Sequence, residues 1–195
     1  MTVSTSELVI ATLNIQGQSG LGDTKQKLIE SFIKHHQLDI LHLQEVEIIS
    51  TTFQNCTYIL SHFNIIQNNS PFNKYGTATL VRSDLSVDNI QCDTNGRVIV
   101  FNIQSVTFSN FYLPAGNDKD MRQSREKYLS ETIPQLIINK KDICLFSGDY
   151  NCIMDKKDSL KYQDQKMSPS LKRFVSVFSL SYSFSHLHPD ANIFS

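Results

Sequence analysis

The fold of this chain is decided by the stretch Leu145-Phe146-Ser147-Gly148-Asp149-Tyr150-Asn151. It continues an apolar run that starts at Ile143, and this run predicts a buried strand that stops at Gly148. Asp149 and Asn151 stand two residues apart, a spacing that puts both side chains on one face of an extended backbone. A carboxylate and an amide on one face can hold a water and a phosphate oxygen. Gly, Asp and Asn are also ordinary turn residues, so the stretch alone fits a simple strand-to-turn transition equally well.

Length and composition indicate one globular domain, over residues 1–195. The 195 residues are 40% hydrophobic and 19% charged, which argues against a disordered chain. The net charge of −1 argues against wholesale wrapping of nucleic acid but allows a locally basic cleft. Four cysteines without metal-ligand spacing and an N-terminus without a signal peptide predict a reduced intracellular protein, nuclear or cytoplasmic and not secreted. No apolar run approaches the roughly 18 residues of a membrane span.

The order of apolar runs predicts an α/β fold. A helix at 24–37 between strands at 8–15 and 38–45 favours a crossover with parallel pairing. Short strands whose spacing favours antiparallel neighbours are expected at 58–67, 77–82, 97–103 and 106–113. Two further helices are expected, at 118–139 with a kink or break at Pro134 and from Ser168-Pro169 to Leu180. Residues 182–195 are expected to be irregular, with a strand starting at 192–194. This order fits two packed β-sheets with helices outside.

Polar residues follow several of the predicted strands directly. Asn14 ends the first strand, Gln44 and Glu45 end the second, and Tyr112 lies beside a Pro-Ala-Gly turn. Catalytic groups often gather where strands end, because rigid strands position them and loops admit substrate. Glu45 is an oxygen ligand of the kind that Mg²⁺ prefers, although a solvated carboxylate at a strand exit is an equally good interpretation of that residue alone.

Four motifs in order resemble the endonuclease/exonuclease/phosphatase superfamily. They are Leu-Asn-Ile-Gln-Gly around Asn14, Leu-Gln-Glu ending at Glu45, Phe-Tyr-Leu-Pro-Ala-Gly around Tyr112, and Gly-Asp-Tyr-Asn at 148–151. The loops look most like the abasic-endonuclease-type endonuclease domains of non-LTR (LINE-type) retrotransposons. The resemblance implies a four-layer α/β/β/α sandwich of two mixed sheets, as in DNase I. It also implies DNA as partner, and a reverse transcriptase domain elsewhere in a longer protein.

The resemblance also implies a role for each motif residue. Glu45 would hold Mg²⁺, with Mn²⁺ as an alternative, and Asn14 would lie close by. Asp149 would orient or deprotonate the attacking water, and Asn151 would donate hydrogen bonds to the phosphate. Tyr112 would contact the scissile phosphate or the leaving group. Such a set suits phosphodiester hydrolysis, in which negative charge grows during in-line attack and needs a cation and fixed donors.

Two arginines after Tyr112 are candidates for contacts to the DNA backbone. Arg122 and Arg125 lie on the predicted helix 118–139, and guanidinium groups bind phosphate in a bidentate manner. A solvated helix face is the simpler interpretation of both.

The sequence departs from the family pattern near its C-terminus. Family members carry a Ser-Arg-Ile-Asp-like strand and a Ser-Asp-His-like ending, which supplies a catalytic histidine, and neither occurs before Ser195. His186 and His188 precede the place where these motifs would begin. The expectation is therefore a C-terminally truncated domain that lacks its last strands, has exposed sheet edges and is inactive as this fragment.

Three functions stay open at this point. The first is a Mg²⁺-dependent DNA-nicking endonuclease that works as part of a longer protein. The second is a non-catalytic remnant that binds metal or nucleic acid weakly. The third is a phosphatase that acts on a small phosphate ester with the same fold, because fold does not fix the substrate.

Overall fold

The computed structural model describes residues 7–16, 23–46, 53, 55–71, 76–155 and 167–187. The chain divides into two units, one formed by 1–112 with 139–149 and the other by 113–138 with 150–195. They are called unit 1 and unit 2 below, and each is described by itself. None of the helices in the described part of the chain has the length and apolar character of a membrane span.

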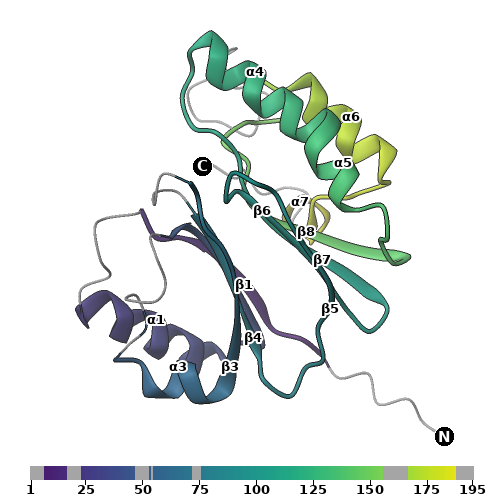
Figure 1. The fold of residues 1–195 in the computed structure, drawn as a ribbon. Helices are drawn as coiled ribbons and strands as arrows, with labels where there is room; N and C mark the ends of the chain where they lie inside the picture. Colours follow the sequence, from purple (N-terminus) through teal and green to yellow (C-terminus); the bar gives the residue numbers. More distant parts are fainter. Residues whose placement is uncertain are drawn as a thin grey trace, which may run out of the picture. The chain divides into compact units, whose positions relative to one another are not determined.

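Unit 1 contains two four-stranded mixed sheets (Figure 1). The first has the order β1-β2-β4-β3, from strands Ile10–Asn14, Ile40–Val46, Gly76–Arg82 and Phe63–Asn68. The second has the order β5-β6-β7-β8, from strands Asp88–Cys92, Val98–Ile103, Val106–Tyr112 and Ile143–Asp149. β1 pairs with β2 and β7 with β8 in parallel, and the other neighbours are antiparallel.

The two sheets pack face to face through an apolar layer. Ile40 and Val81 of the first sheet form one buried cluster with Phe101 and Phe108 of the second. The rings of Phe101 and Phe108 stack, with centroids 5.4 Å apart. Burial of such side chains is worth about 1.5–3 kcal/mol each, so this layer fixes one sheet on the other.

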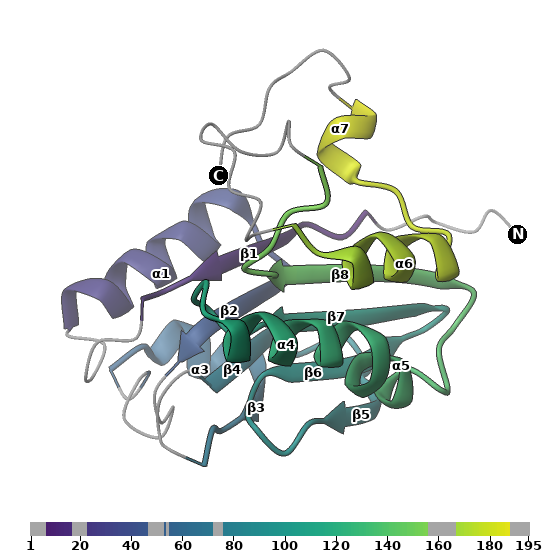
Figure 2. The ribbon, with the colours of Figure 1, turned by 90° about the horizontal axis from the view of Figure 1, so that it is seen from above.

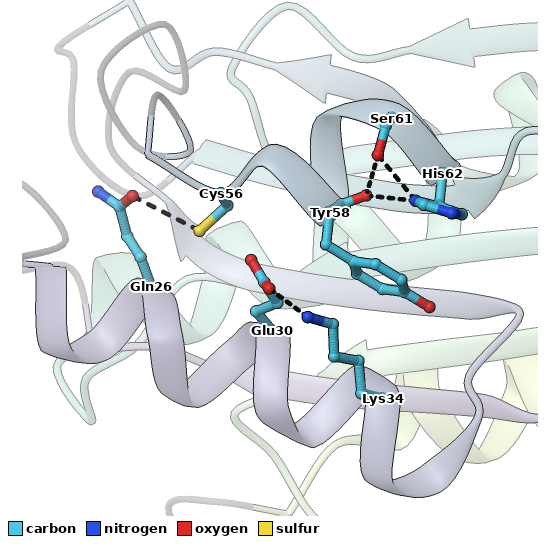
Figure 3. Close-up of polar contacts among 7 residues, drawn as sticks. All are labelled: Gln26, Glu30, Lys34, Cys56, Tyr58, Ser61 and His62. Carbon is cyan, nitrogen blue, oxygen red and sulfur yellow. Dashed lines mark hydrogen bonds and ion pairs between the residues drawn. The ribbon is translucent and has the colours of Figure 1, made fainter.

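The other face of the first sheet is covered by α1 (Asp23–His36) and α3 (Thr57–His62). Ile29 and Ile33 of α1 and Ile59 of α3 share a buried cluster with Leu41 and Leu43 of β2. Polar contacts also join the two helices (Figure 3). The buried thiol of Cys56, the N-cap residue of α3, donates to Gln26 of α1. Lys34 of α1, which pairs with Glu30 of the same helix, lies 4.3 Å from the centroid of the Tyr58 ring of α3.

Unit 2 is helical (Figure 2). α4 (Lys119–Lys127) continues through a π-helical turn, η1 (Tyr128–Thr132), into α5 (Ile133–Leu136), and α6 (Pro169–Val177) packs beside them. Side-chain oxygens cap α4 and α6: Asp118 accepts from Met121 N at 3.0 Å, and Ser168 accepts from Leu171 N at 3.0 Å. A short helix, α7 (Ser183–Leu187), follows.

The predicted fold class, two mixed sheets with helices, is confirmed. Four local predictions were wrong. The strand from Ile143 is present as β8 but is not buried, because it lies at the edge of its sheet, with Ile143 60% and Leu145 37% exposed. The strand expected at 58–67 begins as α3, which becomes β3 only at Phe63. A strand at Asp88–Cys92 was not predicted, and the start of the irregular segment 182–195 forms α7. The helix at 118–139 is present, and its π-helical turn ends at Thr132, two residues before Pro134, where a kink or break was expected. The strand expected at 192–194 lies outside the described residues.

Candidate active site

The sheet topology of unit 1 brings four carboxyl-terminal strand ends together. Asn14 ends β1, Glu45 is the next-to-last residue of β2, Tyr112 ends β7 and Asp149 ends β8. β1 and β2 are parallel neighbours, with Asn14 opposite Gln44. β7 and β8 are also parallel neighbours, with Tyr112 opposite Asp149. Packing of the two sheets then places both pairs at one edge of the sandwich.

The amide of Asn14 joins the two carboxylates of this edge. Its Nδ2 donates to Glu45 Oε1 at 3.0 Å and to Asp149 Oδ2 at 3.0 Å. Its Oδ1 accepts from Gln16 N at 2.9 Å, which fixes the orientation of the amide. One neutral side chain therefore holds a carboxylate from each sheet at a fixed separation, and hydrogen bonds to charged acceptors are the stronger kind.

Glu45 is directed into the site by an irregularity in β2. The register with β4 shifts between Gln44 and Val46, and Glu45 itself has φ of 56°. A bulge re-aims a side chain, and a positive φ costs a non-glycine residue about 1–3 kcal/mol. The hydrogen bonds that Glu45 accepts from Asn14 and Tyr112 compensate for this strain.

Asp149 depends on a close approach of β8 to β7. Gly148 has φ of 133°, and a Cβ at this position would lie 2.1 Å from the carbonyl oxygen of Phe111. Only glycine avoids this clash, so the backbone of β8 directly before Asp149 requires a glycine at position 148.

Tyr112 adds a hydroxyl donor on the same carboxylate. Its phenol is 2% exposed as a residue and donates to Glu45 Oε1 at 2.9 Å. Burial, reinforced by the hydrogen bond to Glu45 and the negative charge there, raises the pKa of the Tyr112 phenol well above its usual range. Tyr112 therefore stays protonated and acts as a hydrogen-bond donor.

A buried polar network lies beneath these groups. Gln44 Nε2 donates to Asn110 Oδ1 at 2.7 Å and to Thr12 Oγ1 at 2.9 Å. Asn110 Nδ2 in turn donates to the carbonyls of Leu43 at 3.1 Å and Ala78 at 2.9 Å. Because Asn110 belongs to β7 and its partners to the first sheet, it fixes the relative position of the residues that precede Glu45 and Tyr112. Sequence reasoning missed this role of Asn110, although its place two residues before Tyr112 puts both on one face.

A family model described as the Endonuclease/Exonuclease/phosphatase family matches residues 11–185. The chain belongs to this family. No curated protein sequence matches it significantly.

Solved structures share the fold of this family member. An AP endonuclease from Archaeoglobus fulgidus is similar with a TM-score of 0.75 and 17% identity, over 96% of this chain and 77% of its own. The 3′ phosphatase NExo from Neisseria, bound to a product DNA hairpin, has a TM-score of 0.70 and 14% identity, over 95% and 76%. TDP2 from Caenorhabditis elegans has a TM-score of 0.57 and 19% identity, over 80% and 50%. At these identities the likeness establishes the fold alone.

Three predicted site residues belong to unit 2. Asn151 has φ of 49°, and its Nδ2 donates to the carbonyl of Leu113 at 2.9 Å. Arg125 is 2% exposed, and its guanidinium donates to the carbonyls of Pro114 at 2.8 Å and Gly116 at 2.6 Å. A contact to DNA would require Arg125 to leave these partners, whereas Arg122 is exposed on α4.

The histidines of unit 1 have other environments. His35 and His36 lie in the last turn of α1, and His62 stacks on Tyr58. His42 is fully buried in β2, where its Nδ1 lies 2.9 Å from Thr79 Oγ1, and burial lowers its pKa to about 3. His186 lies on α7 of unit 2, and His188 is outside the described residues.

Asn14, Glu45, Tyr112 and Asp149 form a strand-end cluster. The oxygen donors of this cluster fit a hard divalent cation held by few protein ligands. Glu45 and Asp149 supply carboxylate oxygens, which suit Mg²⁺, and the cation then keeps most of its positions for water and substrate. No group of three or more His, Cys, Asp or Glu residues that could hold a metal occurs in the described part of the chain. The site therefore fits a cation of the Mg²⁺ type, and it lacks the ligand cage of a structural metal.

Proposed function

We propose that this chain is a Mg²⁺-dependent phosphodiester hydrolase domain that nicks DNA. The observation that carries the proposal is the single amide of Asn14 that holds Glu45 and Asp149 together, with the Tyr112 hydroxyl on Glu45. Membership of the endonuclease/exonuclease/phosphatase family supports the reaction class. DNA as the substrate is supported by the similar NExo structure, which contains a product DNA hairpin.

The side chains divide the work by their chemistry. Glu45 would hold Mg²⁺ with Asn14 beside it, and Mn²⁺ is the alternative ion. When bound, the cation would supply positive charge against the growing charge of the phosphate. Asp149 would orient the attacking water and take its proton, because its carboxylate is fixed at the strand end by the Asn14 amide. Tyr112 and Asn151 would donate hydrogen bonds to phosphate oxygens, and Arg122 would contact the DNA backbone.

We further propose that residues 1–195 by themselves are inactive in DNA nicking. The histidines of unit 1 lie in α1, at the end of α3 and in the buried centre of β2, so they do not add an acid or base to the strand-end cluster. A positioned acid or base typically contributes about 10²–10⁴ in rate. We also propose that the chain originates from a LINE-type retrotransposon and that its partner is a reverse transcriptase domain. We propose an intracellular location, nuclear or cytoplasmic.

A phosphatase is the second candidate. The similar NExo protein is a 3′ phosphatase, and hydrolysis of a terminal phosphate needs the same cation and positioned water. A non-catalytic remnant that binds metal or nucleic acid is the third.

Plasmid nicking tests the proposal. Residues 1–195 are compared with a fusion in which a segment carrying Ser-Arg-Ile-Asp-like and Ser-Asp-His-like motifs from a related endonuclease follows Ser195. The fusion should nick supercoiled plasmid with Mg²⁺ and not with EDTA, and Glu45→Gln or Asp149→Ala should abolish this activity. Residues 1–195 should nick no faster than their own Asp149→Ala variant. Release of inorganic phosphate from a 3′-phosphorylated oligonucleotide without nicking would favour the phosphatase, and an inert fusion would favour the remnant.

A further inference from the structure

Arg97 contacts Tyr112 through both its backbone and its side chain. Arg97 Nη1 donates to the carbonyl oxygen of Tyr112 at 3.1 Å, and its guanidinium carbon lies 5.1 Å from the centroid of the Tyr112 ring. The backbone amide of Tyr112 also donates to the Arg97 carbonyl at 2.8 Å. The guanidinium therefore packs over the ring whose hydroxyl reaches Glu45. In the sequence, Arg97 appears only as the start of a predicted strand.

The backbone of Arg97 is fixed by a turn between β5 and β6. The carboxylate of Asp93 accepts from Arg97 N at 2.7 Å and from Val98 N at 2.8 Å. Gly96 has φ of 77°, and a Cβ there would lie 2.3 Å from the backbone nitrogen of Ser70. This turn restricts the backbone of Arg97, because the Arg97 amide is bonded to Asp93 and the preceding residue, Gly96, packs against the backbone of Ser70.

The same turn is tied to the first sheet. Asn68 of β3 donates to Asp93 Oδ1 at 2.8 Å and to the carbonyl of Val98 at 2.9 Å, and it is buried. Thr77 of β4 donates to the carbonyl of Gly96 at 3.1 Å. The turn that holds Arg97 is thus bonded to both sheets of unit 1. The Asn14 amide likewise joins Glu45 of the first sheet to Asp149 of the second.

The charge of Arg97 opposes that of the carboxylates around Tyr112. Glu45 and Asp149 raise the pKa of the phenol, in addition to burial, and the guanidinium acts in the opposite direction. A cation over the face of an aromatic ring is attracted by the ring electrons, more strongly when the pair is desolvated. Arg97 is partly buried, so the attraction between its guanidinium and the Tyr112 ring is partly desolvated and stabilises this position.

We propose that Arg97 is a positioning residue that acts through Tyr112. By stacking on the ring and bonding its carbonyl, the planar guanidinium holds the phenol hydroxyl on Glu45, at the place where the scissile phosphate would lie. The functional part of this inference rests on the proposed phosphodiester hydrolysis. A purely structural arginine would stabilise the hairpin without controlling where the Tyr112 hydroxyl points.

The test follows the Tyr112 hydroxyl directly by NMR of protein labelled with ¹³Cζ-tyrosine. The Tyr112 resonance is identified by its loss in Tyr112→Phe. Glu45→Gln, which changes the acceptor of the hydroxyl, gives the shift expected when this hydrogen bond is altered. Arg97→Gln should move the Tyr112 resonance in the same direction, toward the exposed Tyr182. Arg97→Lys, which keeps the charge but has no planar group, should move it too, and it serves if Arg97→Gln does not fold.

Arg82→Gln is the matched control, because Arg82 pairs with Asp39 and Asp84 away from Tyr112. It should leave the Tyr112 resonance in place. An unchanged resonance in Arg97→Gln, a full return to the wild-type position in Arg97→Lys, or an equal shift in Arg82→Gln would each overturn the inference.

Failure of the proposed function has a different signature. If the fusion described above shows no Mg²⁺-dependent nicking while Arg97→Gln still moves the Tyr112 resonance, Arg97 positions Tyr112 but the hydrolase proposal is wrong. If the fusion nicks and Arg97→Gln in it is as active as the parent, the hydrolase proposal stands and the role of Arg97 in the reaction is wrong. A loss of about 10- to 100-fold is expected, the scale of a misplacement of about 1 Å.

Discussion

Gly148→Ala should both destabilise the chain and release Asp149 from the site. A Cβ at this position would lie 2.1, 2.6 and 2.8 Å from the O, N and C atoms of Phe111, all of which belong to the backbone of β7. No side-chain rotation relieves such contacts, so β8 must move away from β7. The alanine must in addition adopt φ of 133°, a region that is essentially restricted to glycine.

The magnitude follows from these two effects. Backbone strain of this kind costs about 1–3 kcal/mol, and overpacking adds about 1–3 kcal/mol. The free energy of unfolding should therefore fall by roughly 2–6 kcal/mol. For a chain of 195 residues, 1 kcal/mol corresponds to a shift of about 2–4 °C in Tm, so a decrease of roughly 4–24 °C is expected.

Gly116→Ala is the matched control for a melt followed by circular dichroism. Gly116 also has a positive φ, of 104°, but a Cβ there would meet side-chain atoms of Met121 and Asp118 at 3.2 and 3.3 Å. These side chains can move, so Gly116→Ala should show the strain of φ without the backbone clash. A Gly148→Ala variant that melts within 2 °C of wild type, or no lower than Gly116→Ala, would refute this account of β8.

Three further predictions concern buried or capping groups. Arg125→Met should lower the free energy of unfolding in urea by about 3 kcal/mol, because two carbonyls lose a buried charged donor, and a change below about 0.5 kcal/mol would contradict this role. Ser168→Ala should cost about 1 kcal/mol and Ser168→Asp should restore most of it, since either oxygen caps α6; equal stability of the alanine and aspartate variants would speak against the cap. Because the pKa of His42 is lowered to about 3, the unfolded chain binds more protons than the native one below pH 6.5, so stability should fall by up to about 1.4 kcal/mol per pH unit from about pH 6.5 toward 3, and an unchanged slope in His42→Gln would exclude this source.

The parts of the fold that follow local pattern were predictable from sequence. The helix at 24–37 and the strand at 38–45 have long apolar patterns, and both are present as α1 and β2 within one or two residues. The segment 58–67 is different, because a short apolar run fits a helix or a strand equally well. Burial of Ile59 against the first sheet decides in favour of helix there, and this tertiary contact is not visible in the sequence.

The candidate site divides in the same way. Asn14, Glu45, Tyr112 and Asp149 could be named because each stands at the end of an apolar run, and the structure brings them together. The positive φ of Glu45 could not be anticipated, because the bulge depends on the register between β2 and β4.

Arg125 shows the limit of reasoning from residue type. An arginine on a helix after the Tyr112 motif fits a phosphate contact, yet its guanidinium is buried on the carbonyls of Pro114 and Gly116. Asn110 and Arg97 were missed for the complementary reason, since their roles depend on partners 32 to 67 residues away and 15 residues away, respectively.

The melting temperature with and without about 10 mM Mg²⁺ tests the central claim most directly, that Glu45 is the metal ligand of a strand-end site. A ligand that binds with a Kd of about 1 mM adds roughly 1.4 kcal/mol at that concentration, or about 3–6 °C in Tm. Wild type should show this increase, and so should Glu30→Gln, a matched change of a carboxylate that pairs with Lys34 on α1. Glu45→Gln should fold and show none. An equal increase in Glu45→Gln and wild type, or no increase in either, would contradict the assignment.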